Sequence, residues 1–130
     1  MNIHEINEKK WNSIFGNEFR PNMVNITLGQ MQSEQLKIHC RIDKENQPFP
    51  DKLNSREDIN RICFSIIFDG IKKISITPPF SGLGIISIEK KTIKECSIYI
   101  NNLLSFQIES ETIQISDIKM DYFDINNEGL

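Results

Sequence analysis

The residues best suited to chemistry in this chain are two histidines, His4 and His39, and three cysteines, Cys40, Cys63 and Cys96. Such side chains can hold zinc, and a histidine can activate a serine or cysteine nucleophile. No close Cys/His spacing resembles a zinc site. Neither histidine has a nearby sequence partner typical of a zinc protease or of a catalytic triad, and His39 is predicted to point outward from a strand. We expect a surface histidine and no metal site.

The sequence also lacks the common motifs for nucleophilic catalysis and phosphate binding. No Gly-x-Ser-x-Gly elbow occurs, and the glycines of the segment 82–84 are too close together for a phosphate-binding loop and open no helical pattern. Carboxylate pairs can always be drawn among eighteen acidic residues, so we assign none to acid–base catalysis. The sequence therefore predicts a protein that is not an enzyme and needs no cofactor.

The cysteines and the chain ends indicate a cellular compartment. Cys40 and Cys96 are each in phase with isoleucines two positions away on either side, which predicts reduced thiols in the core of a cytoplasmic protein. The first residues contain no apolar signal core, and no run approaches the ~18 apolar residues of a membrane span. We expect a cytoplasmic protein with no membrane partner.

Length and charge suggest one acidic domain, residues 1–130. The net charge is −3 and the isoelectric point is near 5.4, which argues against broad affinity for nucleic acid. Isoleucine dominates the apolar residues and alanine is absent, which favours strands over helices. An AT-rich genome would explain the same bias, so composition alone does not assign the fold.

Residues 61–76 are the stretch around which we expect the fold to be organised. Asp69-Gly70 between two β-rich runs predicts a hairpin of strands 61–68 and 71–76. A two-residue loop would split the apolar residues between two faces. We favour a three-residue loop, 68–70, with Gly70 in a left-handed bulge, because it gathers one apolar face. That face would consist of Ile62, Phe64, Ile66, Ile74 and Ile76.

The rest of the chain supplies one helix and further strands. We predict a helix at about 4–15, anchored on the sheet by Trp11, a loop at 77–84, and a bulge or bend near Ser116-Asp117. The segment 43–60 reads as the longest loop, either functional or a mobile connector. The remaining strands are expected at about 23–31, 36–42, 85–89, 96–100, 103–109 and 112–123. The predicted fold class is mainly β (α+β), with about eight mostly antiparallel strands in a meandering sheet or sandwich and one N-terminal helix packed on it.

Acidic and aromatic residues gather in the C-terminal third of the chain. They either solvate the surface or form a protein-binding face, because charge steers association and aromatics supply anchors. The candidate binding residues are Glu109, Glu111, Asp117, Asp121, Tyr122 and Asp124. Lys72, Lys73, Lys90, Lys91 and Lys94 could form a basic rim near strand ends.

A family resemblance gives these features a functional meaning. The order Trp11-x-x-x-Phe15-Gly16, a proline at 21, and then alternating strands resembles the small bacterial immunity proteins of polymorphic toxin systems. The proline-containing loop and the Ile/Phe-rich segment 62–76 fit the same pattern. The chain is most similar to the immunity family numbered fifty. Members often carry a His-Asp pair soon after the proline, where Asn22-Met23 stand here.

The resemblance implies a cytoplasmic antitoxin that binds the C-terminal domain of a cognate toxin. Inhibition would be stoichiometric and non-covalent, with a monomer or weak homodimer as the active form. If the acidic C-terminal residues contribute, charge reversal at Asp121 and Asp124 should weaken binding and lower its salt dependence. The alternative function is a small β-rich ligand-binding domain or an enzyme subunit, which predicts a deep apolar pocket lined from several strands.

Overall fold

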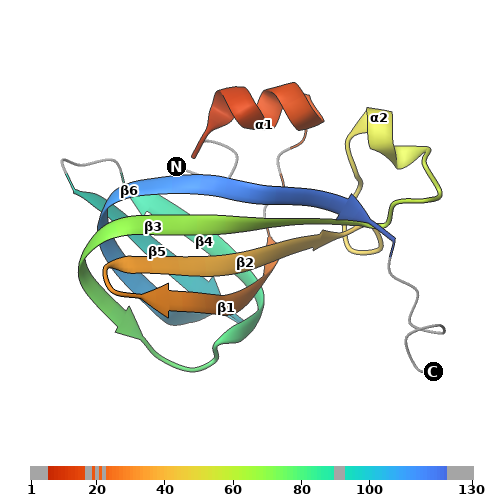
Figure 1. The fold of residues 1–130 in the computed structure, drawn as a ribbon. Helices are drawn as coiled ribbons and strands as arrows, with labels where there is room; N and C mark the ends of the chain where they lie inside the picture. The colour runs from red at the N-terminus through yellow and green to blue at the C-terminus, as the bar shows by residue number, and fades with distance from the viewer. Residues whose placement is uncertain (1–5, 17–18, 20, 22, 90–92, 123–130) are drawn as a thin grey trace.

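The computed structural model describes residues 6–16, 19, 21, 23–89 and 93–122, and within them it is mainly antiparallel β-structure, as predicted. Helices and strands follow one another along the chain as coloured in Figure 1. They are α1 (Glu8–Phe15), β1 (Val24–Gln32), β2 (Gln35–Asp43), α2 (Asp51–Asn54), β3 (Arg61–Ile76), β4 (Ser81–Glu89), β5 (Lys94–Ile100) and β6 (Leu103–Asp121).

The strands form a closed barrel in the order β1-β2-β3-β6-β5-β4, so the predicted eight-strand meandering sheet or sandwich is wrong in its finer form. All neighbouring strands are antiparallel. The seam between β1 and β4 is short, running from Val24 opposite Gly84 to Thr27 opposite Ser81. Six described strands replace eight because two predicted hairpins are long continuous strands.

The predicted hairpin at Asp69-Gly70 is the first of these corrections. β3 runs unbroken through this dipeptide and pairs with β6 along its whole length, from Arg61 opposite Asp121 to Ile76 opposite Phe106. Gly70 does adopt a left-handed conformation, with φ of +65°. Here that freedom bends the strand and does not reverse it.

The predicted turn at residues 109–111 is the second correction, since segments 103–109 and 112–123 belong to the single strand β6. The two turn signals lie side by side, because Asp69 pairs with Thr112 and a Cβ on Gly70 would come 2.7 Å from Glu111 Oε2. A register shift follows at once, between Ile71 and Lys73. Both strands therefore bend together, and this bend curves the β3–β6 pair so that the sheet can close into a barrel.

The predicted bulge near Ser116-Asp117 is confirmed. Asp117 has φ of +56°, and the β3–β6 register shifts between Cys63 and Ser65, the positions opposite it. An extra residue in one strand of an antiparallel pair increases the local twist. This bend and the one at Gly70 give β6 the curvature that a long strand needs in a small barrel.

The predicted loop 77–84 is wrong from Ser81 onward, because β4 already begins there and pairs with β1. Glycine explains the difference. A Cβ on Gly84 would lie 2.5 Å from the Tyr99 carbonyl oxygen and 2.7 Å from Ile26 Cδ1. Gly84, which looks like a strand breaker in the sequence, thus lets β4 lie close to both β5 and β1 as the barrel closes.

Apolar side chains fill the barrel interior, and the predicted common face of β3 is confirmed even though the hairpin is not. Ile62, Phe64 and Ile66 are buried, and Ile74 and Ile76 pack against the same core. The bulge after Ile71 keeps the second half of β3 in phase with the first. Other fully buried members of the core are Ile26, Leu36, Ile38, Ile42, Phe68, Ile98, Ile100 and Phe106.

Two thiols lie within this core. Cys40 on β2 and Cys96 on β5 are free and buried, as predicted, while Cys63 is half-buried. Burial raises the pKa of the Cys96 thiol to about 12 and raises that of Cys40 as well, since a thiolate is poorly solvated there. These two cysteines pack as small apolar residues.

Helix α1 lies alongside β6 and docks through Trp11, as predicted (Figure 1). The indole contacts Phe15, Phe19 and Phe64 at centroid distances of 4.8 to 5.9 Å and donates a 2.9 Å hydrogen bond to the Phe19 carbonyl oxygen. The helix begins at Glu8, while the first part of the predicted range of about 4–15, residues 4 and 5, lies outside the described residues.

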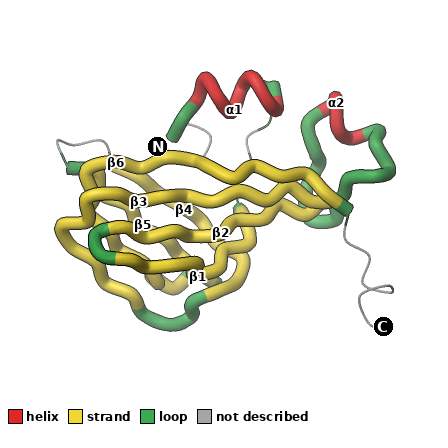
Figure 2. Tube along the Cα trace, in the orientation of Figure 1, coloured by secondary structure: helices red, strands yellow, loops and turns green. Residues whose placement is uncertain are grey.

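The segment between β2 and β3 is a loop with a short helix, α2, shown red among green loops in Figure 2. Three apolar residues attach it to the core: Phe49, Leu53 and Ile59 are buried. Because its apolar residues are needed for packing, this segment has a structural explanation that does not require a functional one.

Candidate functional site

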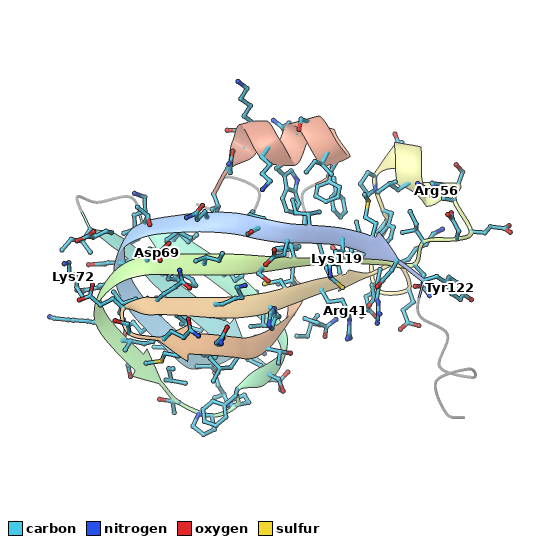
Figure 3. The ribbon with its side chains drawn as sticks, in the orientation of Figure 1. Arg41, Arg56, Asp69, Lys72, Lys119 and Tyr122 are labelled. Atoms are coloured by element: carbon cyan, nitrogen blue, oxygen red, sulfur yellow. The ribbon has the colours of Figure 1, made fainter. Side chains whose placement is uncertain are left out.

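The acidic residues suggested by the sequence do not form one face. Glu109 and Glu111 lie on one half of β6, and Asp117 and Asp121 lie on the other. Twelve strand residues at about 3.3 Å each separate the two ends by roughly 40 Å. In Figure 3, Lys72, the ion-pair partner of Glu111, and Tyr122 lie at opposite ends of the barrel. Asp124 lies outside the described residues.

Three of these carboxylates are paired with cations, two on the neighbouring strand β3 and one on β2, which lies one strand further away. Asp117 lies 3.3 Å from Lys37 Nζ, Glu111 lies 2.9 Å from Lys72 Nζ, and Asp121 accepts two hydrogen bonds from Arg61. The Asp121 hydrogen bond raises the pKa of the Arg61 guanidinium, although burial opposes it. Local pairing of this kind reduces the negative field that these residues could offer to a partner.

A hollow of about 730 Å³ lies on the outer surface of β3, β6, β5 and β4. Its strand residues alternate with core residues such as Ile86, Ile98 and Phe106, so its floor is the outer face of the barrel wall. We call this hollow the groove. It is lined by Lys73, Ile74, Ser75, Ser87, Glu89, Glu95, Ser97, Tyr99, Gln107, Ile108 and Glu109.

One side of the groove is a row of charged side chains set by the strand register. Lys73 pairs with Glu109, Glu109 with Glu95, and Glu95 with Glu89, so the four residues cross the four strands in a line. Glu95 and Glu109 at the centre are half-buried. Three glutamates and one lysine give this acidic row a formal charge of −2.

The middle of the groove is a row of small polar residues. Ser75 pairs with Gln107, Gln107 with Ser97, and Ser97 with Ser87. Serine side chains are shorter than glutamate or tyrosine, so this serine row is low on β3, β5 and β4, whereas the longer Gln107 side chain rises from it on β6. The hydroxyl groups can both donate and accept hydrogen bonds.

On the opposite side the groove is lined by Tyr99, which continues into an apolar row beyond the hollow itself. Tyr99 pairs with Ile85 on β4 and Leu104 on β6, and these three residues are 40 to 43% exposed. Large apolar side chains placed side by side on a surface are a common mark of interaction sites. This apolar row and the acidic row enclose the serine row from either side.

His39 has a structural role that the sequence did not indicate. It is exposed, as predicted, and its Nδ1 lies 3.0 Å from Ser65 Oγ on β3. Its ring lies against Gly29, where a Cβ would come 2.9 Å from Nε2. Because Ser65 is only 3% exposed, its hydroxyl cannot reach a substrate, and the pair joins β2 to β3.

No group of three or more histidine, cysteine or acidic side chains in the described part of the chain could hold a metal ion. None of the helices described is both long and apolar enough to pass through a bilayer.

Among the groove residues, sequence reasoning named only Glu109 as a binding candidate and placed Lys73 in a possible basic rim, because the groove depends on pairing between distant strands. A partial signal was present: polar residues share one phase in each of the segments 87–89, 95–97 and 107–109. Alternation predicts that these polar side chains point away from the core, but it cannot predict which strands are paired with one another.

Comparison of the chain with protein-family models, with curated proteins and with solved structures finds no match.

Proposed function

We propose that the protein is an immunity protein that binds a basic surface of a cognate toxin domain through the groove and blocks it by stoichiometric, non-covalent coverage. The observation that carries the proposal is the groove itself, with its acidic row facing an apolar row across a floor of small residues. The sequence resemblance to immunity proteins supplies the class of partner.

The composition of the groove suits a protein partner. Carboxylates increase the rate of encounter with a basic protein and select against acidic ones. Tyr99 supplies an amphipathic ring of the kind that often dominates binding energy, beside the aliphatic contacts of Ile85 and Leu104. The acidic row has a formal charge of −2, and Glu109 within it is one of the residues that the sequence suggested.

A small-molecule carrier or enzyme subunit has less support. That function calls for a deep apolar pocket reached from several strands, whereas the barrel axis is occupied by buried side chains such as Ile38, Ile66 and Phe106. The groove is shallow-floored and lined chiefly by polar groups, which suits a macromolecular surface better than a small apolar ligand.

Growth protection tests this function directly. The gene next to that of the protein should encode a large secreted toxin, whose C-terminal domain would be expressed from an inducible promoter in a bacterial host. Co-expression of the protein should restore growth and yield a one-to-one complex on co-purification. Growth arrest despite full expression of both chains, with no complex recovered, would overturn the proposal.

A further inference from the structure

We propose that the groove receives a single amphipathic α-helix of the partner, with basic side chains along one flank and apolar side chains along the other. This inference rests on the proposed function, and it adds the shape and chemistry of the element that is bound. Helix-in-groove recognition usually depends on side chains repeated at helical spacing, read by a complementary surface.

The width of the groove fits a helix. On β5 the acidic row and the apolar row are represented by Glu95 and Tyr99, four residues apart, which is about 13 Å at 3.3 Å per residue. On β4 the same spacing separates Glu89 from Ile85. A helix with its side chains is about 10–12 Å across, so it can lie on the serine row and contact both sides.

The length and volume agree with this fit. Four strands spaced about 4.8 Å apart place β3 and β4 roughly 14 Å from each other across the groove, which corresponds to nine or ten helical residues at about 1.5 Å rise. Half of a cylinder 11 Å wide and 14 Å long occupies roughly 670 Å³. The groove encloses about 730 Å³. The volume of such a helix segment and that of the groove are therefore of the same order.

The chemistry of the three rows fixes the orientation of the helix about its axis. Arginine or lysine would face Glu89, Glu95 and Glu109, with fewer cations at the β3 end, where Lys73 stands. Leucine or a similar residue would face Tyr99. The serine row leaves room only for small residues, such as alanine or serine, along the underside of the helix.

A designed helical peptide can test this inference without the toxin. The probe is a lactam-bridged, alanine-based peptide with arginines at every fourth position along one flank and leucines along the other. A control peptide has the same composition in scrambled order. Titration into ¹⁵N-labelled protein should shift the amide signals of Ser87, Ser97 and Gln107, with affinity at least about tenfold greater than that of the scrambled peptide. Equal shifts with both peptides, or none up to the solubility limit, would overturn the inference.

Substitutions in the protein provide a second test. Ser97→Trp would raise the floor of the groove and should weaken probe binding by at least about tenfold. Thr27→Trp, on the exposed face of β1 and outside the groove, should leave binding unchanged. Amide spectra of both variants check that they fold. If Ser97→Trp does not, Glu95→Lys serves in its place, and an unchanged affinity in that variant contradicts the inference.

The toxin domain separates this inference from the proposed function. If the toxin domain binds and Glu95→Lys weakens it, but the helical probe leaves every groove amide unshifted, the partner is not a helix and only the inference fails. If the probe binds with the expected selectivity but no toxin domain is neutralised, the groove recognises a helix and the proposed function fails.

Discussion

The short seam between β1 and β4 makes Gly84 a critical position, and Gly84→Ala should open it. The added methyl group would lie 2.5 Å from the Tyr99 carbonyl oxygen, 2.7 Å from Ile26 Cδ1 and 3.3 Å from Ile100 Cγ1. The first contact is with the backbone of β5, which cannot rotate away, and the second is with an isoleucine of β1 across the seam, so β4 must shift against both neighbouring strands. Gly84 has no positive φ, so the effect is steric and not conformational.

Overpacking of this kind costs about 1–3 kcal/mol, and a chain of this size loses roughly 3–5 °C in melting temperature per kcal/mol. We therefore expect Gly84→Ala to melt roughly 3–15 °C lower than the wild-type protein. Thermal unfolding monitored by circular dichroism gives the melting temperature, and hydrogen exchange should show faster exchange of the β1 amides from Val24 to Thr27. Ser87→Ala, on the exposed face of the same strand, is the control and should lie within about 0.5 kcal/mol of wild type. A Gly84→Ala variant as stable as Ser87→Ala would refute the account of barrel closure.

Three further predictions test the packing, the thiols and one ion pair. Trp11→Ala should destabilise the protein by about 3–5 kcal/mol in urea unfolding, because the buried indole contacts three phenylalanine rings, and a loss below 1 kcal/mol would contradict its anchoring role. An aromatic-disulfide thiol reagent should label Cys63 in the native protein and reach Cys40 and Cys96 only after unfolding. Equal labelling of all three thiols would contradict the burial of Cys40 and Cys96 in the core. Arg56 donates hydrogen bonds to Asp58 and lowers the pKa of that carboxyl, so their pairing is present at neutral pH and is lost as the pH falls through the lowered pKa. NMR titration should place the Asp58 midpoint lower in the wild type than in Arg56→Ala, and coincident midpoints would rule this out.

Alternation in the sequence predicted which residues enter the core, and it did so even where the topology was wrong. Ile62, Phe64 and Ile66 share the interior with Ile74 and Ile76, although no hairpin separates them. Burial depends on local phase, which apolar periodicity reports directly. Strand pairing depends on contacts distant in sequence, so alternation did not reveal that β3 and β6 run side by side along their full lengths.

Glycine caused the main topological errors for one physical reason. In the sequence, the conformational freedom of Gly70 and the missing side chain of Gly84 both predict a turn or loop. In the structure, Gly70 bends a long strand and Gly84 allows close approach at the seam. The same residue type serves all of these purposes, and only the packing around it shows which one applies.

The acidic residues illustrate a related limit. The sequence places Glu109, Asp117 and Asp121 in one region of the chain, but they are spread over a stretch of the bent strand β6 that is about 40 Å long when measured along the strand. Glu89 and Glu95, which precede them in sequence, are the true neighbours of Glu109 through the register of β4, β5 and β6. The surface that a partner would meet is therefore set by barrel closure.

Calorimetry between the protein and the cognate toxin domain tests the central claim most directly. The account predicts one-to-one binding that the double variant Glu95→Lys/Glu109→Lys weakens at least about tenfold, with a smaller dependence on salt. The matched variant Asp117→Lys/Asp121→Lys makes the same change in charge outside the groove and should bind nearly as well as wild type. Strong binding by the groove variant, together with loss of binding by the matched variant, would contradict the account. That result would indicate that the toxin domain binds at the C-terminal end of β6, near Asp117 and Asp121.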